Sequence, residues 1–254
     1  MKTLISSDLP RIDDHFVKED SRVEVVRGFL LMSPPAEEPH ATLHLTLAYL
    51  LAAHVGPDYA GAVDMLTRTS RDSDFAPDAS VYPAERDPET GGRRLEELAF
   101  EIASTQPLDS AGEKARELVR RGVRRVFCIV VRHLRVLEWS TETDGWSPLL
   151  DDSSIEDRCF VRPLPVVSLL HATATHDAVV AALDARENPA LRAIEARGEA
   201  RGRSAALLAV LGARGLVPSD TERQRILEAE SAVLDQWIAR SPFISETSEL
   251  FSGG

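Results

Sequence analysis

The sequence has few cysteines, few aromatic residues and no long apolar stretch. It holds two cysteines among 254 residues, and Cys128 lies inside an apolar run, so the pair supports neither a disulfide framework nor a multi-cysteine metal site. No stretch approaches the roughly 20 apolar residues of a membrane-spanning helix. The first eight residues lack the apolar core of a signal peptide. These absences predict a cytoplasmic protein with no membrane partner.

Positive charge is also scarce. The chain has 29 lysines and arginines against 41 acidic residues, a formal net charge of -12. Such a protein repels nucleic acid unless its basic residues gather in one place. The segment 111–135 is such a place, because it carries eight basic residues and two glutamates. A polyphosphate could dock there, although charge runs of this kind are more often a solvated helix face.

Several catalytic signatures are missing. The chain shows no glycine-rich phosphate loop, no serine elbow and no dinucleotide fingerprint. His40 and His44 have the i, i+4 spacing of a metal-binding pair, but the residue after His40 is Ala41 and not the glutamate of a zinc metalloprotease. The pattern therefore argues against those enzyme classes.

The first two thirds of the chain alternate strand-like and helix-like segments. Helical spacing covers 39–54, which Gly56-Pro57 ends, and about 110–121, which Gly122 ends. Short runs rich in apolar and β-branched residues occupy 23–33, 60–68, 76–82, 97–103, 125–131, 134–139 and 146–150. The run at 127–131 is typical of a strand buried on both faces. We therefore expect an α/β fold with a central mixed sheet.

Beyond residue 171 the strand signals stop and the composition becomes helical, which predicts a domain at 1–170 and a helical C-terminal extension at 171–254. Ser219 and Glu222 have the spacing of a capping box at the start of a second helix, 219–240. That helix carries a broad apolar side that must be buried. Folding back onto the core and docking against the same tail of a second subunit, as a homodimer, both meet this need. The side consists of Ile226, Leu227, Val233, Leu234, Trp237 and Ile238.

Two acidic residues occupy strand-like positions. Asp78 opens one strand after Pro77, and Glu101 follows 23 residues later inside an apolar strand. A carboxylate is costly to bury there unless it is paired or binds metal. Two carboxylates on neighbouring strands can share a hard cation such as Mg²⁺, and the alternative is a pair of strand-edge acids facing solvent.

A series of short motifs along residues 20–150 resembles one known family. The motifs are Glu24-Val25-Val26-Arg27-Gly28, Met32-Ser33-Pro34-Pro35 with His40, Pro77-Asp78, Phe100-Glu101-Ile102-Ala103-Ser104, and Lys114 with Gly122-Val123. In this order they resemble the Uma-type restriction endonucleases of the PD-(D/E)XK nuclease superfamily. The resemblance implies a restriction-endonuclease-like mixed sheet flanked by helices, with Mg²⁺ or Mn²⁺ held by Asp78 and Glu101.

One departure concerns the superfamily's lysine, which commonly lies two residues after the glutamate, where this chain has Ala103. Lys114 would reach in from the following helix, so Asp78, Glu101 and Lys114 are the expected catalytic residues. Glu24 is either a third metal ligand or an outward polar residue of its strand. His40 either assists near the metal or makes a local cap or packing contact.

The resemblance, taken with the residues, implies two hypotheses of function. The first is a metal-dependent endonuclease that hydrolyses DNA phosphodiester bonds, with Arg121 and Arg125 contacting phosphates. The second is a nuclease fold that no longer cuts and serves as a binding or assembly module, which the overall acidity and Ala103 favour. A partner-recruiting tail is compatible with either.

Overall fold

The computed structural model describes residues 9–18, 21–32, 37–104 and 108–252. Ser33, Pro34 and Pro35, which belong to the family motifs above, lie outside the described residues, as do the first eight residues. The chain forms two compact units, Met1–Arg186 and Glu187–Gly254. None of the helices in the described part combines the length and apolar character that a bilayer crossing demands.

The first unit is built on a six-stranded mixed sheet, as the sequence predicts. Its strand order is β10-β9-β8-β7-β6-β3, with β7 and β8 parallel and the other neighbours antiparallel. Helix α2 (Leu108–Arg121) connects the two parallel strands. The strands are β3 (Tyr59–Val63), β6 (Ala79–Pro83), β7 (Leu98–Ala103), β8 (Arg125–Val130), β9 (Arg135–Ser140) and β10 (Gly145–Pro148).

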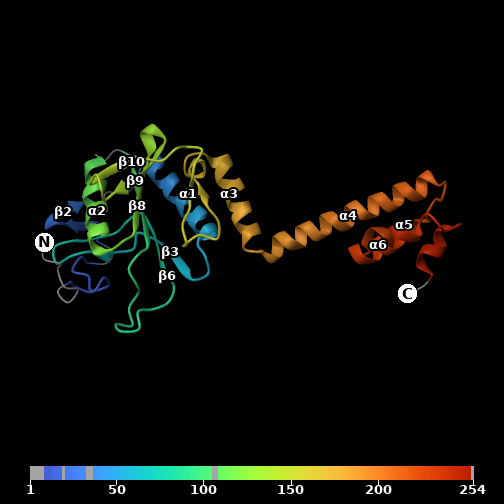
Figure 1. Cartoon of the computed structure of the whole chain (residues 1–254), viewed down its shortest axis with the longest axis horizontal. Coiled ribbons are helices and arrows are strands. Elements are labelled where there is room, and N and C mark those ends of the chain that lie inside the picture. Colours follow the sequence, from blue (N-terminus) through green and yellow to red (C-terminus); the bar gives the residue numbers. More distant parts are fainter. Residues whose placement is uncertain (1–8, 19–20, 33–36, 105–107, 253–254) are drawn as a thin grey trace. The chain divides into compact units, whose positions relative to one another are not determined.

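Strand β7 shows why this sheet needs a helix on each face. All six of its residues are buried. Leu98, Phe100 and Ile102 pack in the core that contains helix α1 (Glu38–His54). Ala99 and Ala103 turn to the opposite face, where α2 packs. Figure 1 shows α1 and α2 on opposite sides of the strands. Because Glu101 alternates with Ile102, its side chain belongs to the α2 face.

A smaller four-stranded sheet, of order β2-β1-β5-β4, packs beside α2. Arg27 and Gly28 join β1 to β2 with φ of 53° and 80°, the backbone of a type I′ hairpin turn. Val26 and Phe75 from this sheet are buried with α2. The strands are β1 (Val23–Val26), β2 (Phe29–Met32), β4 (Thr67–Arg68) and β5 (Asp74–Phe75).

The end of the first unit covers helix α1. Ala178, Val179 and Ala182 of helix α3 pack in the same core as Leu47 and Leu50 of α1. The boundary between the units therefore lies after Arg186, later than the expected boundary at 170–171. The other elements here are η2 (Val131–His133), β11 (Ser154–Ile155), β12 (Leu164–Pro165), η3 (Val166–Leu169) and α3 (Ala172–Ala185).

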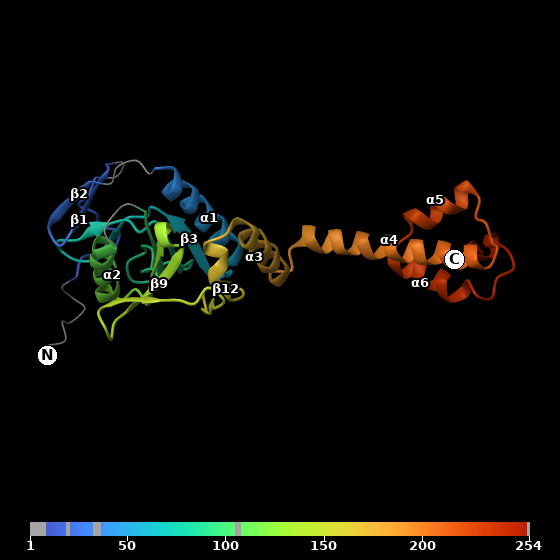
Figure 2. The same ribbon diagram turned by 90° about the horizontal axis from the view of Figure 1, so that it is seen from above.

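The second unit is helical and has its own core. Ile226, Leu234 and Trp237 are buried with Leu207 and Leu211 of α4, so much of the apolar side predicted for 219–240 is covered within this unit. The elements are α4 (Pro189–Ala213), α5 (Asp220–Glu228), α6 (Ser231–Arg240) and η4 (Thr247–Phe251), and Figure 2 shows the three longer helices together.

The structure corrects one detail of the predicted tail. The expected helix 219–240 is interrupted, because Ala229 and Glu230 have extended backbone conformations between α5 and α6. Leu227, expected on the apolar side, is 49% exposed. The capping box is present as predicted, with Ser219 and Glu222 satisfying each other's backbone N–H groups.

Candidate metal centre

Asp78 and Glu101 lie side by side in the sheet. Ala79 pairs with Phe100 in the antiparallel β6–β7 register, which puts the preceding Asp78 opposite Glu101 on the α2 face. The carboxylate of Asp78 accepts a hydrogen bond of 2.5 Å from the backbone N–H of Ile102. This bond fixes one oxygen of Asp78 against the strand that carries Glu101.

Helix α2 places Lys114 among these acids. The Lys114 ammonium lies 2.8 Å from Oε2 of Glu24 and 3.7 Å from Oε2 of Glu101. Glu24, from β1, also accepts a 3.1 Å hydrogen bond from the backbone N–H of Ala76. Side-chain exposure of Lys114, Glu24 and Glu101 is 13%, 12% and 7%. The lysine therefore points inward, between two carboxylates from different sheets.

The cluster has an electrostatic imbalance at Glu101. Burial raises the pKa of Glu101 to about 8, with the nearby Asp78 and Glu24 adding to the rise and Lys114 opposing it. Burial alone would lower the pKa of Lys114, but Glu101 and Glu24 outweigh it and the pKa is raised. Among the described residues, Oε1 of Glu101 is buried with no hydrogen-bond partner. An acidic cluster with an unused buried carboxylate oxygen fits a divalent cation.

Two histidines of α1 reach Asp78 from the other side. His40 Nε2 lies 3.3 Å from Oδ1 of Asp78, and this hydrogen bond raises the pKa of His40. His44 Nε2 lies 2.7 Å from the backbone carbonyl of Asp78 and 3.5 Å from Oδ1 of Asp64. The i, i+4 spacing therefore puts both rings beside the same aspartate, where they stack 6.2 Å apart.

Asp64 is the residue that the sequence analysis missed. It follows β3 directly, and the pairing of Val63 with Ala79 places it opposite Asp78. Within the described ranges, one group of three metal-binding residues has ligand atoms within 4.8 Å of one another, namely His44, Asp64 and Asp78. An acidic residue at the end of a strand that pairs with the strand of Asp78 is a signal that could have identified Asp64. The predicted strand 60–68 runs through Asp64, so this strand end was not predicted.

Arg121 and Arg125 are not brought to this cluster. Arg125 holds the carboxylate of Glu138 at 2.6 and 2.9 Å and that of Asp157 at 3.1 Å. Arg121 donates to the backbone carbonyl of Pro10 at 2.6 Å. Both guanidinium groups therefore have internal acceptors from distant parts of the sequence, which the local charge count does not reveal.

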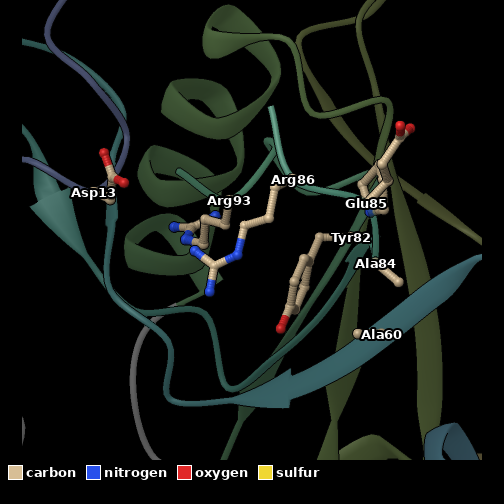
Figure 3. Close-up of a pocket in the computed structure, with 8 residues that line it drawn as sticks. Asp13, Ala60, Tyr82, Ala84, Glu85, Arg86 and Arg93 are labelled. Carbon is tan, nitrogen blue, oxygen red and sulfur yellow. The ribbon is translucent and has the colours of Figure 1, made fainter. Parts of the chain in front are cut away.

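A separate open pocket of about 330 Å³ lies at the opposite end of β6. The side chains of Tyr82, Arg86 and Arg93 converge on it (Figure 3). Arg93 is paired with Glu96 at 2.9 Å, whereas Arg86 has no ion-pair partner within the part of the chain that the structure describes. None of the predicted site residues lines this pocket.

Comparisons with known proteins point to one family. The model of the family Uma2, described as "Putative restriction endonuclease", matches residues 7–157, a span that holds every predicted site residue. A crystal structure from Anabaena variabilis, described as a "putative nuclease belonging to DUF820", is similar at 14% identity and a TM-score of 0.49 over 60% of this chain and 90% of that one. No curated protein sequence matches the chain.

Proposed function

The chain belongs to the Uma2 family, and from this membership we propose that its first unit is a metal-dependent endonuclease that hydrolyses DNA phosphodiester bonds. The observation that carries the proposal is the buried Glu101 carboxylate, which has an oxygen without a hydrogen-bond partner among the described residues and lies beside Asp78, Glu24 and Lys114. A metal-dependent nuclease needs such a cluster to hold a divalent cation near a phosphate.

In this proposal Asp78 and Glu101 hold Mg²⁺ or Mn²⁺, with Glu24 as a third ligand. The ion would polarise the phosphate and lower the pKa of water. His40 keeps the Asp78 carboxylate in place through the 3.3 Å contact to Oδ1. The hydrogen bond from Ile102 does the same for Oδ2, so Asp78 is held from both sides.

Lys114 has two roles in the proposal. Without a metal, its ammonium partly neutralises Glu24 and Glu101 at 2.8 and 3.7 Å. With those carboxylates engaged by a divalent ion, the ammonium is free to orient the attacking water and offset the negative charge that develops on the phosphate. Lys114 can take this role from α2, in place of a lysine at position 103, because α2 covers the sheet face that carries Glu101.

Phosphate contacts are proposed for Arg121 and Arg125. Arg121 and Arg125 would each have to exchange an internal acceptor for a phosphate. Replacing both by alanine is expected to weaken binding to all sequences and to flatten its salt dependence. Arg86, in the pocket of Figure 3, gives the comparison, because a flatter salt dependence for Arg86→Ala alone would move the phosphate contacts to that pocket.

Homodimerisation is also proposed, since two sites allow both DNA strands to be cut. The C-terminal unit exposes Val217 by 84% and Phe243 by 86%, which leaves apolar surface after its core is formed. Light scattering of the full chain and of Phe243→Ser tests this. A monomer at high concentration rejects it.

The experiment that tests the function is DNA cleavage by Asp78→Asn. Pure wild type is incubated with linear, supercoiled and single-stranded DNA, with and without Mg²⁺ or Mn²⁺. The amide keeps the volume and removes the charge, so metal-dependent cleavage is expected to be lost while the fold persists. Asp152→Asn, at an exposed aspartate, is the matched control. Unchanged cleavage by Asp78→Asn contradicts the assignment.

The second candidate function is a binding or assembly module. The Lys114 ammonium already pairs with Glu24 and Glu101, which gives the cluster a partner without metal, and Ala103 stands where the superfamily commonly has lysine. Wild-type protein that cleaves none of the DNA forms and gives no heat on Mn²⁺ titration would establish this reading.

A further inference from the structure

A second group of possible ligands lies on the opposite side of Asp78 from Glu101 and Lys114. It draws on three elements. His44 comes from α1, Asp64 follows β3, and Asp78 precedes β6. Helix α1 packs on the sheet face to which β3 and β6 contribute. The register of these two strands places Asp64 opposite Asp78.

The distances in this group are those of ligands around one ion. His44 Nε2 lies 2.7 Å from the carbonyl oxygen of Asp78 and 3.5 Å from Oδ1 of Asp64. The nitrogen and the two carboxylate oxygens fit within 4.8 Å of one another. Two ligands bound at about 2.0–2.2 Å to a tetrahedral or octahedral ion are roughly 2.9–3.5 Å apart. His44 Nε2 and Oδ1 of Asp64 already have this spacing, and the three ligand atoms, all within 4.8 Å of one another, would draw together around the ion.

We propose that His44, Asp64 and Asp78 form a second divalent-cation site, with the Asp78 carbonyl as a further ligand. Its class of ion differs from that of the Glu101 site. Imidazole is a good ligand for transition metals and a poor one for Mg²⁺. Two carboxylates and a neutral imidazole carry the charge that balances one dication. The site therefore binds Mn²⁺ or Zn²⁺ in preference to Mg²⁺.

The surroundings separate this site from the one in the proposed function. Glu24 and Glu101 are held by Lys114 and do not belong to the group. Only Asp78 is shared, and His40 braces its Oδ1. Asp64 is 70% exposed, so an ion can reach the group from solvent. The proposal rests on binding geometry and does not require that the protein cuts DNA.

The test is a Mn²⁺ titration of the full-length protein, followed by electron paramagnetic resonance and calorimetry, with Zn²⁺ and Mg²⁺ as competitors. The wild type is expected to bind two Mn²⁺ ions. Asp64→Asn is expected to lose one of them, and Glu101→Gln to lose the other. Asp58→Asn, an exposed aspartate just before β3, is the matched control and keeps both.

A spectroscopic signature identifies the ligand directly. Electron spin echo modulation from ¹⁴N is expected for Mn²⁺ bound to His44, and His44→Gln abolishes it while circular dichroism shows an intact fold. Zn²⁺ is expected to displace this Mn²⁺ at a concentration at least about tenfold below the Mg²⁺ needed.

The outcomes distinguish the two sites. A single Mn²⁺ that Glu101→Gln removes and Asp64→Asn retains, without ¹⁴N modulation, overturns the second site and leaves the proposed nuclease site standing. A single Mn²⁺ with ¹⁴N modulation that Asp64→Asn removes supports the second site and counts against metal binding at Glu101. No bound Mn²⁺ overturns both.

Discussion

Two buried acidic residues of the first unit, Asp157 and Glu101, differ in how fully their carboxylates are hydrogen-bonded. The side chain of Asp157 is 1% exposed and accepts hydrogen bonds from Arg124 at 2.7 and 2.8 Å, from Arg125 and from the backbone of Cys159. Glu101 is almost as buried, yet one of its oxygens has no partner among the described residues. The first arrangement stabilises the fold, and the second leaves a carboxylate available for chemistry.

Asp157→Asn is expected to destabilise the first unit by about 2 kcal/mol at pH 7. The loss is smaller than for a fully buried ion pair, because the partner Arg124 is 35% exposed. Burial alone would raise the pKa of Asp157, but the hydrogen bonds from Arg124, Cys159 and Arg125 outweigh it and hold the pKa well below its ordinary value. A depressed pKa adds stability above the unfolded-state pKa, near 3.9, and that stability is lost as the pH falls through the folded pKa. Urea unfolding from pH 7 to pH 2 measures both effects.

The wild type and Asp157→Asn should therefore approach each other in stability as the solution becomes acidic. Asp152→Asn, on the surface, should follow the wild type throughout. Parallel curves for wild type and Asp157→Asn down to the lowest pH would show that the Arg124 pairing contributes nothing through ionisation.

Glu101→Gln is expected to abolish cleavage without lowering the melting temperature. Burial works against the charged carboxylate, as its raised pKa shows, and the amide removes that cost while Lys114 keeps Glu24 at 2.8 Å. A gain of about 1 kcal/mol would raise the melting temperature by about 2–4 °C. Calorimetry with a chelator present measures it. A fall of several degrees would mean that Glu101 is a structural residue.

At the scale of elements, the sequence predicts the members of the sheet better than their boundaries. Apolar and β-branched runs identify β7 and β8, and helical spacing identifies α1 and α2, because each element buries a regular face. The predicted strand 60–68 ends instead at Val63, where Asp64 takes φ of 49°. Asp tolerates this conformation in a turn, and no alternation pattern marks it.

The same limit applies to side-chain partners. Asp78 and Glu101 could be proposed together because an acid in an apolar strand is costly to bury unless it is paired or binds metal, and Lys114 was added to them by the resemblance to the nuclease family. The ion pairs of Arg125 could not be predicted, since Glu138 and Asp157 reach it through β9 and the segment before β12. Local charge is readable in the sequence, whereas its neutralisation depends on tertiary contacts.

Ser219→Ala is expected to destabilise α5 by about 1 kcal/mol. The Ser219 hydroxyl accepts from the backbone N–H of Glu222, and the Glu222 carboxylate accepts from the backbone N–H of Ser219. Amide hydrogen exchange of α5 in the full chain should accelerate about fivefold, as that energy implies. Ser231→Ala, where α6 begins without a side-chain cap, should leave exchange in α5 unchanged. Equal exchange rates of α5 in the two variants would mean that the capping box does not stabilise this helix.

At the scale of the whole molecule, the two units have separate cores. The clusters that hold α1 and α2 end at Leu183, and the cluster of α4 to α6 begins at Ala200. Residues 1–186 are therefore expected to fold alone with the first unit's melting temperature and to keep the cleavage activity that we propose for this unit. Residues 1–170 lack α3, whose Val179 is 3% exposed and packs in the core with Leu47, and should lose about 3 kcal/mol or more.

Calorimetry of the two truncations measures this difference. Equal melting temperatures would mean that α3 does not stabilise the first unit. An unfolded 1–186 chain would mean that the C-terminal helices are needed for the first unit to fold.

The separation of Glu24 from Lys114 bears on the order of events during biosynthesis. These two residues meet in space although 90 positions separate them in the chain, and α2 packs on a sheet that requires β8, which ends at Val130. A nascent polypeptide that has emerged only as far as Glu101 contains all three acidic residues of the cluster but neither Lys114 nor strand β8. The cluster of Glu24, Asp78, Glu101 and Lys114 therefore forms only after the chain has been synthesised as far as Val130, near the middle of the sequence.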